Sequence, residues 1–261
     1  MVFIKLMQHF IAFRYCRMVS MGCLPFVLLA CGTTGINATT KPLAYVPAHT
    51  ESASTLAFIP KLKVNKKGQV LPYSARVNPY LKQRGFIGKS SIDAFLQAKR
   101  AYDSGEYSQA KTVLRGLLQT KPKLSGPWVM LGDIALAEKD LASAKDNFSK
   151  AITVNKNNVN AYIRLAKVQR MLGEFTQAKA VYAAVLAIWS DFPEAHLNLG
   201  VLYDVYLNDD VKAQKHIEAY QFLTGGRNAE VATWLLEIQE RTGMTTELNV
   251  QQPELIGKPV S

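Results

Sequence analysis

Residues that bind metals or act as nucleophiles are scarce in this chain of 261 residues, which has 3 cysteines and 4 histidines. No Cys, His and acidic residues share the spacing of a metal site. The sequence also has no glycine-rich phosphate loop and no Gly-x-Ser-x-Gly motif. We therefore expect no catalytic residues, no metal and no cofactor, and predict that the protein is not an enzyme.

Acidic residues are nearly missing from the first third of the chain. Residues 32–90 hold nine basic side chains and a single acidic one, Glu51, whereas residues 91–261 hold nineteen of each sign. The net charge of +11 therefore belongs to the N-terminal third and not to the remainder. Because a nucleic-acid-binding domain usually carries its own basic surface, we expect no nucleic-acid partner.

The first thirty residues lack the length of apolar sequence that a membrane-spanning helix needs. A basic stretch precedes an apolar run of about a dozen residues, the pattern of a signal peptide, here residues 1–30. The run ends in a motif that resembles the lipobox of bacterial lipoproteins: Leu28, Leu29, Ala30 and Cys31. The resemblance implies that Cys31 is acylated after cleavage and that the lipid holds the protein on a membrane. An ordinary signal peptide, or an N-terminal anchor with an incidental cysteine, is the alternative.

Cysteine usage agrees with the lipoprotein interpretation. Cys16 and Cys23 lie in the segment to be removed, so Cys31 alone would remain and no disulfide could form within the mature chain. In lipoprotein signals, a glycine such as Gly32 after the cysteine favours transport to the outer membrane. The resemblance thus implies a periplasm-facing lipoprotein of the Gram-negative outer membrane, with the inner membrane less expected.

A 34-residue period runs through residues 91–226. Its clearest columns are Trp128, Tyr162 and His196; Leu131, Leu165 and Leu199; Gly132, Ala166 and Gly200; Ala110, Ala144 and Ala178; Leu114, Phe148 and Tyr182. A fixed period of this length indicates stacked supersecondary units, none of which buries its apolar face alone. The apolar spacing within each unit predicts two amphipathic helices. The small residues of the third column are expected where paired helices cross most closely.

These columns resemble the tetratricopeptide repeat, or TPR. The resemblance implies an all-α solenoid of about four helix-turn-helix repeats, residues 91–124, 125–158, 159–192 and 193–226, with a capping helix at 229–242. The first repeat is degenerate. In the fourth, the second helix is displaced by one residue, and we expect an enlarged turn at Asn208-Asp209-Asp210 to hold the insertion.

The segments flanking the TPR domain, residues 91–243, lack a helical period. Residues 31–57 are predicted to be a flexible Thr/Ser/Pro linker, and residues 244–261 a disordered tail. Residues 58–90 are basic with interspersed apolar side chains. They form either a solvated linker that packs a few side chains on the first repeat, or a binding segment for an anionic envelope component, such as lipid head groups, peptidoglycan or an acidic partner.

In TPR arrays the first helix of each repeat lines a concave groove that binds a protein or peptide. The resemblance places the groove here at Phe95, Lys99, Tyr102, Val129, Asp133, Leu136, Asn160, Ile163, Lys167, Arg170, Leu197, Val201 and Asp204. A TPR subclass that grips a peptide carboxylate needs Asn or Lys at the places of Val129 and Asp133. We therefore expect a helix or extended peptide with apolar anchors instead.

These features together predict a non-catalytic adaptor for an envelope complex. The layout resembles that of TPR lipoproteins that assist the assembly of type IV pilus secretins. Two alternatives are an adaptor for peptidoglycan hydrolases and an accessory of a TonB- or Tol-type system. A hypothesis of another class is a cell-wall or lipid-binding protein that acts through residues 58–89.

Overall fold

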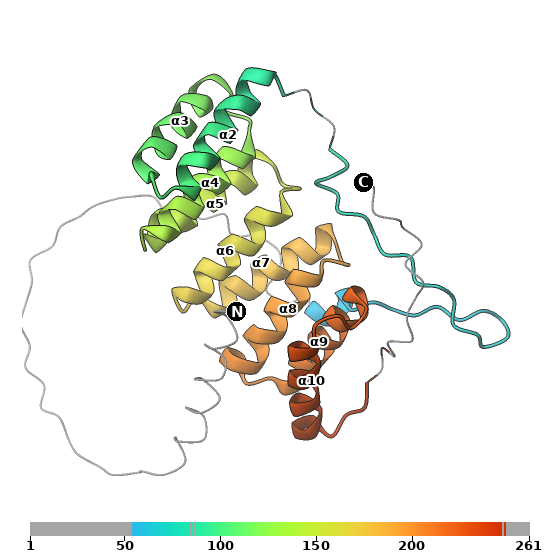
Figure 1. Cartoon of the computed structure of the whole chain (residues 1–261). Helices are drawn as coiled ribbons and strands as arrows, with labels where there is room; N and C mark the ends of the chain where they lie inside the picture. The colour runs from blue at the N-terminus through green and yellow to red at the C-terminus, as the bar shows by residue number, and fades with distance from the viewer. Residues whose placement is uncertain (1–53, 84, 86, 247, 249–261) are drawn as a thin grey trace, which may run out of the picture. The chain divides into compact units, whose positions relative to one another are not determined.

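The computed structural model describes residues 54–83, 85, 87–246 and 248 (Figure 1). The predicted signal peptide, the lipobox and Cys31 lie outside these residues. Within them the secondary structure is helical, and β-structure is confined to an isolated bridge between Val64 and Val70. No helix of this described part is both long and apolar enough to cross a bilayer.

The helices occur in the predicted pairs along the chain. Their bounds are α2 (Lys89–Asp103), α3 (Tyr107–Thr120), α4 (Ser125–Ala137), α5 (Leu141–Val154), α6 (Val159–Met171), α7 (Phe175–Ile188), α8 (Pro193–Val201), the π-helix η3 (Leu202–Leu207), α9 (Asp210–Thr224) and α10 (Ala229–Thr242). Each helix packs against the next along the chain, and α10 packs against α9 (Figure 1). The prediction of an all-α TPR solenoid with a terminal capping helix is confirmed.

Two glycines permit the closest helix crossings. A Cβ atom on Gly132 of α4 would overlap the ring of Phe148, and a Cβ on Gly200 of α8 would overlap Ile217. Both neighbouring side chains are fully buried. The glycine column of the repeat therefore has the predicted cause, because a side chain there would separate the paired helices.

A left-handed residue ends the first helix of each repeat. Gly105, Lys139 and Gly173 have φ values of 79°, 62° and 76° and are spaced by 34, whereas Asn208, with φ of 53°, comes 35 residues after Gly173. The inserted residue of the fourth repeat therefore precedes Asn208.

Backbone hydrogen bonds locate the insertion. The amide of Glu106 donates to the carbonyl of Ala101 (2.8 Å), five residues back, and the second and third repeats have equivalent bonds. In the fourth repeat the amide of Asp209 donates to Tyr203 (3.0 Å), six residues back. The expectation of an enlarged turn at Asn208-Asp209-Asp210 is therefore wrong. The additional residue is accommodated in η3, because a π-helical turn contains one more residue than an α-helical turn.

The segment before α2 contacts the far end of the repeat array. A 3-10 helix, η2 (Thr55–Phe58), packs against α7 and α9. Ile59, Leu62 and Tyr73 pack on a cluster that includes Ala219 and Phe222 of α9. The interpretation of residues 58–90 as a linker packed on the first repeat is therefore wrong for its first half. Thr55, assigned to the flexible linker, is 2% exposed.

The chain after α10 packs on α9, the helix that η2 also contacts. Leu248 is buried against Ala219 and Phe222 of α9, and the side-chain amide of Gln214 donates to the carbonyl of Met244 (3.2 Å). The predicted disordered tail, 244–261, is thus packed at its start.

Candidate functional site

The first helices of three repeats line one hollow. Its volume is about 310 Å³, and its walls come from α2, α4 and α6 together with Tyr80. Of the thirteen predicted groove residues, those that line it are Phe95, Lys99, Tyr102, Val129, Asp133 and Asn160. Residues 65 positions apart are thereby brought to one surface, as the 34-residue period requires.

One side of the hollow is apolar and aromatic. Phe95 and Tyr102 lie on α2 at a spacing of seven residues, two helical turns, and therefore share a face. Val129 of α4 adds an aliphatic surface, and all three side chains are partly exposed. Phe95 also lies against Gly126, where an added Cβ would sit 3.6 Å from the ring. This side can accept an apolar anchor.

The other side of the hollow is charged. The guanidinium of Arg164 donates from Nε to the carboxylate of Asp133 (2.8 Å), which joins α6 to α4. Burial raises the pKa of Asp133, and Arg164 opposes this shift. Lys99 pairs with Asp103 one helical turn away (2.6 Å). The hollow therefore offers polar groups at fixed positions beside its apolar wall.

Tyr80 reaches the hollow from outside the repeats. Near it, the side-chain amide of Asn155 donates to Gln83 (2.7 Å), which ties this part of the N-terminal segment to the turn before α6. Nothing in the 34-residue pattern connects position 80 to the groove. Sequence reasoning missed it, and also missed the hollow's other lining residues: Asp103, Gly126, Met130, Asn158 and Arg164.

The remaining predicted groove residues lie elsewhere. Lys167 is exposed, and four others are partly exposed outside the hollow: Leu136, Ile163, Arg170 and Leu197. Val201 and Asp204 are buried, at 4% and 6% exposure. Asp204 accepts a hydrogen bond from the Trp234 indole of α10 (2.9 Å) and pairs with Arg241. The capping helix covers Asp204, and Val201 is buried, so the placement of these two residues on an open groove is wrong.

A group of hydrogen bonds at the turn before α8 attaches the N-terminal segment to the repeat array. The carboxylate of Asp191, in the turn before α8, accepts the hydroxyl of Tyr73 (2.7 Å) and the amide of Arg76 (2.6 Å). The indole of Trp189 donates to the carbonyl of Arg76 (2.7 Å). Burial and the bond to Asp191 raise the pKa of Tyr73. Asp191 is itself 5% exposed, and these hydrogen bonds satisfy its buried carboxylate oxygens.

A buried chain of hydrogen bonds fixes η2. His196 Nε2 lies 2.8 Å from the carbonyl oxygen of Ser190, and the Nδ1 atoms of His196 and His216 are 3.0 Å apart. His216 Nε2 lies 2.9 Å from the hydroxyl of Thr55, which lies 2.8 Å from that of Tyr203.

The proton positions in this chain follow from its end. A carbonyl only accepts, so Nε2 of His196 donates to Ser190 and its Nδ1 accepts from His216. Nε2 of His216 then accepts from Thr55, whose oxygen accepts from Tyr203. Burial lowers the pKa of His196 to about 4 and that of His216 well below its usual value, and the neighbouring His196 lowers the latter further. Both imidazoles are therefore neutral when η2 is bound.

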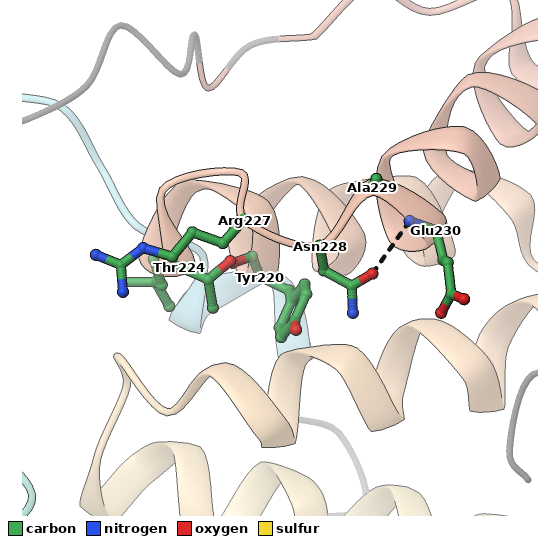
Figure 2. A pocket seen from close by; sticks show the side chains of 7 residues that line it. Tyr220, Thr224, Arg227, Asn228, Ala229 and Glu230 are labelled. Carbon is green, nitrogen blue, oxygen red and sulfur yellow. Dashed lines mark hydrogen bonds between the residues drawn. The ribbon is translucent and has the colours of Figure 1, made fainter. Parts of the chain in front are cut away.

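A further hollow of about 620 Å³ opens between the end of α9 and the start of α10 (Figure 2). Tyr220 and Arg227 line it together with Glu230. At its edge the Asn228 side chain accepts the backbone amides of Glu230 (3.1 Å) and Val231 (3.2 Å). Asn228 is thus the N-cap of α10, and its side chain already pairs with these two backbone amides. No group of three metal-ligating side chains occurs within the described residues.

Comparisons with known proteins agree with the fold. Residues 135–197 match the family model described as a tetratricopeptide repeat. Superkiller complex protein 3 of Mus musculus is 30% identical over 121 residues, which is 44% of this chain and 8% of that protein. The chain thus spans less than a tenth of this curated relative.

Solved structures give the same result. A tetratricopeptide repeat protein from Parabacteroides merdae is 18% identical, with a TM-score of 0.52 over 60% of this chain and 61% of that one. MamA from Desulfovibrio magneticus, residues 41 to the end, is 18% identical, with a TM-score of 0.51 over 60% and 88%. At this identity the likeness concerns the fold. The repeat domain has the TPR fold, which is typical of non-catalytic scaffolds that bind other proteins.

Proposed function

We propose that the protein is a non-catalytic adaptor that binds a protein segment along α2, α4 and α6. The observation that carries this proposal is the hollow, in which the groove positions of three successive repeats meet beside an apolar wall. The ligand that fits best is a helix or an extended peptide with an apolar anchor. Helix-in-groove recognition of this kind places a few apolar side chains into such a wall.

The two sides of the hollow predict where the apolar and the polar groups of the ligand would lie. Its apolar anchor would lie on Phe95, Tyr102 and Val129, and its polar groups beside the Asp133–Arg164 pair. Because that pair is already satisfied internally, its main contribution is to fix the position of α6 relative to α4. Aromatic residues centred in an interface usually carry most of its binding energy, so we assign that role to Phe95 and Tyr102.

An experiment on α2 tests this assignment. The full chain and two variants, Phe95→Ala and Leu96→Ala, are used to capture the partner from a detergent extract of the native envelope. Leu96 is the matched control because it is an exposed apolar residue of the same helix, 44% exposed, that does not line the hollow. We expect Phe95→Ala to reduce capture at least tenfold and Leu96→Ala to leave it unchanged. Equal capture by the two variants, with unchanged helicity, refutes the groove.

We also propose the location. Acylation of Cys31 would hold the repeats at the periplasmic face of the outer membrane, where the adaptor assists an envelope complex. Support comes from the lipobox sequence at residues 28–31. Changing Cys31 to Ser is expected to release the protein from membranes, and unchanged fractionation contradicts this part of the proposal. Assembly of a pilus secretin, docking of a peptidoglycan hydrolase and service to a TonB- or Tol-type system are narrower forms of it.

A further inference from the structure

The N-terminal segment contains a β-hairpin that does not line the groove. Residues 61–71, here called the lysine hairpin, turn back through Asn65 and Gly68, and the amide of Leu71 donates to the carbonyl of Lys63 (2.8 Å). The side-chain oxygen of Asn65 accepts the amides of Lys67 (2.9 Å) and Gln69 (3.0 Å). Gly68 takes φ of 77°, a value that favours glycine.

We propose that the lysine hairpin is a contact site for an anionic lipid surface. The first observation is its charge: Lys61, Lys63, Lys66 and Lys67 are all exposed. Residues 54–88, which include the whole hairpin, contain no Asp or Glu. Four exposed ammonium groups within seven residues, in a stretch of sequence that has no carboxylate of its own, complement a surface of phosphate head groups.

Exposed apolar side chains lie among these lysines. Val64 and Val70 face each other across the hairpin and are 61% and 60% exposed, and Leu71 is 42% exposed. Apolar side chains flanked by lysines are typical of segments that insert into the boundary between head groups and acyl chains. Nucleic acid would use the charge but not the valine pair, so the combination favours a lipid surface.

The base of the hairpin is fixed to the repeat array. Leu62 at its start and Tyr73 beyond its end both pack on the cluster formed by Ala219, Phe222 and Leu248. The rings of Tyr73 and Phe222 meet edge to face with centroids 5.0 Å apart. The hairpin is therefore a preformed element and needs no ordering when it meets a surface, which lowers the entropic cost of binding.

Vesicle binding by the full chain tests the proposal. One vesicle contains about one third phosphatidylglycerol in phosphatidylcholine and the other contains phosphatidylcholine alone. The ratio of the two partition coefficients isolates the preference for anionic lipid. Each lysine near such a surface strengthens binding about fivefold, so Lys63→Gln/Lys66→Gln/Lys67→Gln should lower this ratio by about a hundredfold. The matched control removes the same charge from turns between repeats: Lys121→Gln/Lys123→Gln/Lys156→Gln.

A second readout reports on the hairpin itself. Val70→Trp places an indole at its apolar pair, and brominated lipids quench an indole that enters the bilayer. We expect quenching of this added fluorescence in anionic vesicles and its loss in the hairpin triple variant. The proposal is overturned if the two triple variants bind alike, or if the indole is never quenched. Neither result bears on the groove, because no hairpin residue lines it.

Discussion

Acidification is predicted to release η2 and destabilise the fourth repeat. His196 and His216 are fully buried, and each uses one nitrogen as an acceptor. Protonation of His196 places its Nδ1–H against the Nδ1–H of His216, and protonation of either imidazole buries a charge. In the unfolded chain both have a pKa near 6.5. The folded pair has lowered pKa values, about 4 for His196. The stability from the neutral pair is therefore complete above pH 6.5 and is lost as the pH falls toward 4.

The magnitude follows from proton uptake. At pH 5 the unfolded chain binds nearly one proton at each imidazole and the folded chain binds almost none. Integrated from pH 7 to pH 5, His196 alone lowers the free energy of unfolding by about 2 kcal/mol, and the lowered pKa of His216 acts in the same direction. Urea unfolding followed by circular dichroism at several pH values measures this loss. His9 and His49 lie outside the described residues, so the titrating pair must be identified with a variant.

The control replaces both buried histidines with residues that do not titrate, His196→Gln/His216→Gln. This variant should be less stable at pH 7, because the hydrogen-bond geometry is altered, but its stability should change little between pH 6.5 and pH 5. If the variant and the unmodified chain lose stability in parallel, the buried neutral pair is not the cause and the reasoning fails.

Three further predictions concern packing and the backbone. Gly132→Ala should destabilise the fold by about 1–3 kcal/mol, since the added methyl meets a buried ring of α5; Gly116→Ala, on an exposed helical face with open space, should stabilise it by up to about 1 kcal/mol, and thermal unfolding compares them. Lys139→Gly should raise the free energy of unfolding by up to about 1 kcal/mol by relieving a left-handed lysine, and no gain in urea unfolding would contradict this. Asp191→Ala removes the two hydrogen bonds that its carboxylate accepts from the N-terminal segment, about 3 kcal/mol together, and should expose residues 54–88 to proteolysis at least tenfold faster; unchanged cleavage would count against the attachment.

The 34-residue pattern was sufficient to predict the features that recur in every repeat. Each repeat presents the same apolar columns, so the close crossings at Gly132 and Gly200 followed from the period. The groove positions on α2 and α4 came from the resemblance to the TPR family. The position of the insertion followed from neither. A turn and a π-helical residue shift later columns equally, and they are separated by the left-handed φ of Asn208 and by the hydrogen bond from Asp209 to Tyr203.

Contacts made once in the chain left no sequence signal. Thr55 bonds Tyr203 across 148 residues, and Tyr73 bonds Asp191 across 118. No period joins such pairs, and a threonine in a polar stretch resembles any other. Asp204 was misplaced for a related reason, because its position in the repeat faces a groove, but the Trp234 indole of α10 covers it here.

The most direct test of the adaptor function is photo-crosslinking at two sets of exposed positions. A benzophenone side chain is placed at Lys99, Asn160 or Lys167 on the first helices. The matched set is Gln109, Ser143 and Gln177, one 34-residue column on the second helices. We expect the three first-helix probes to capture one common protein from living cells and the second-helix probes not to capture it. Capture of the same protein with equal yield from both sets, or from the second-helix set alone, would contradict this expectation.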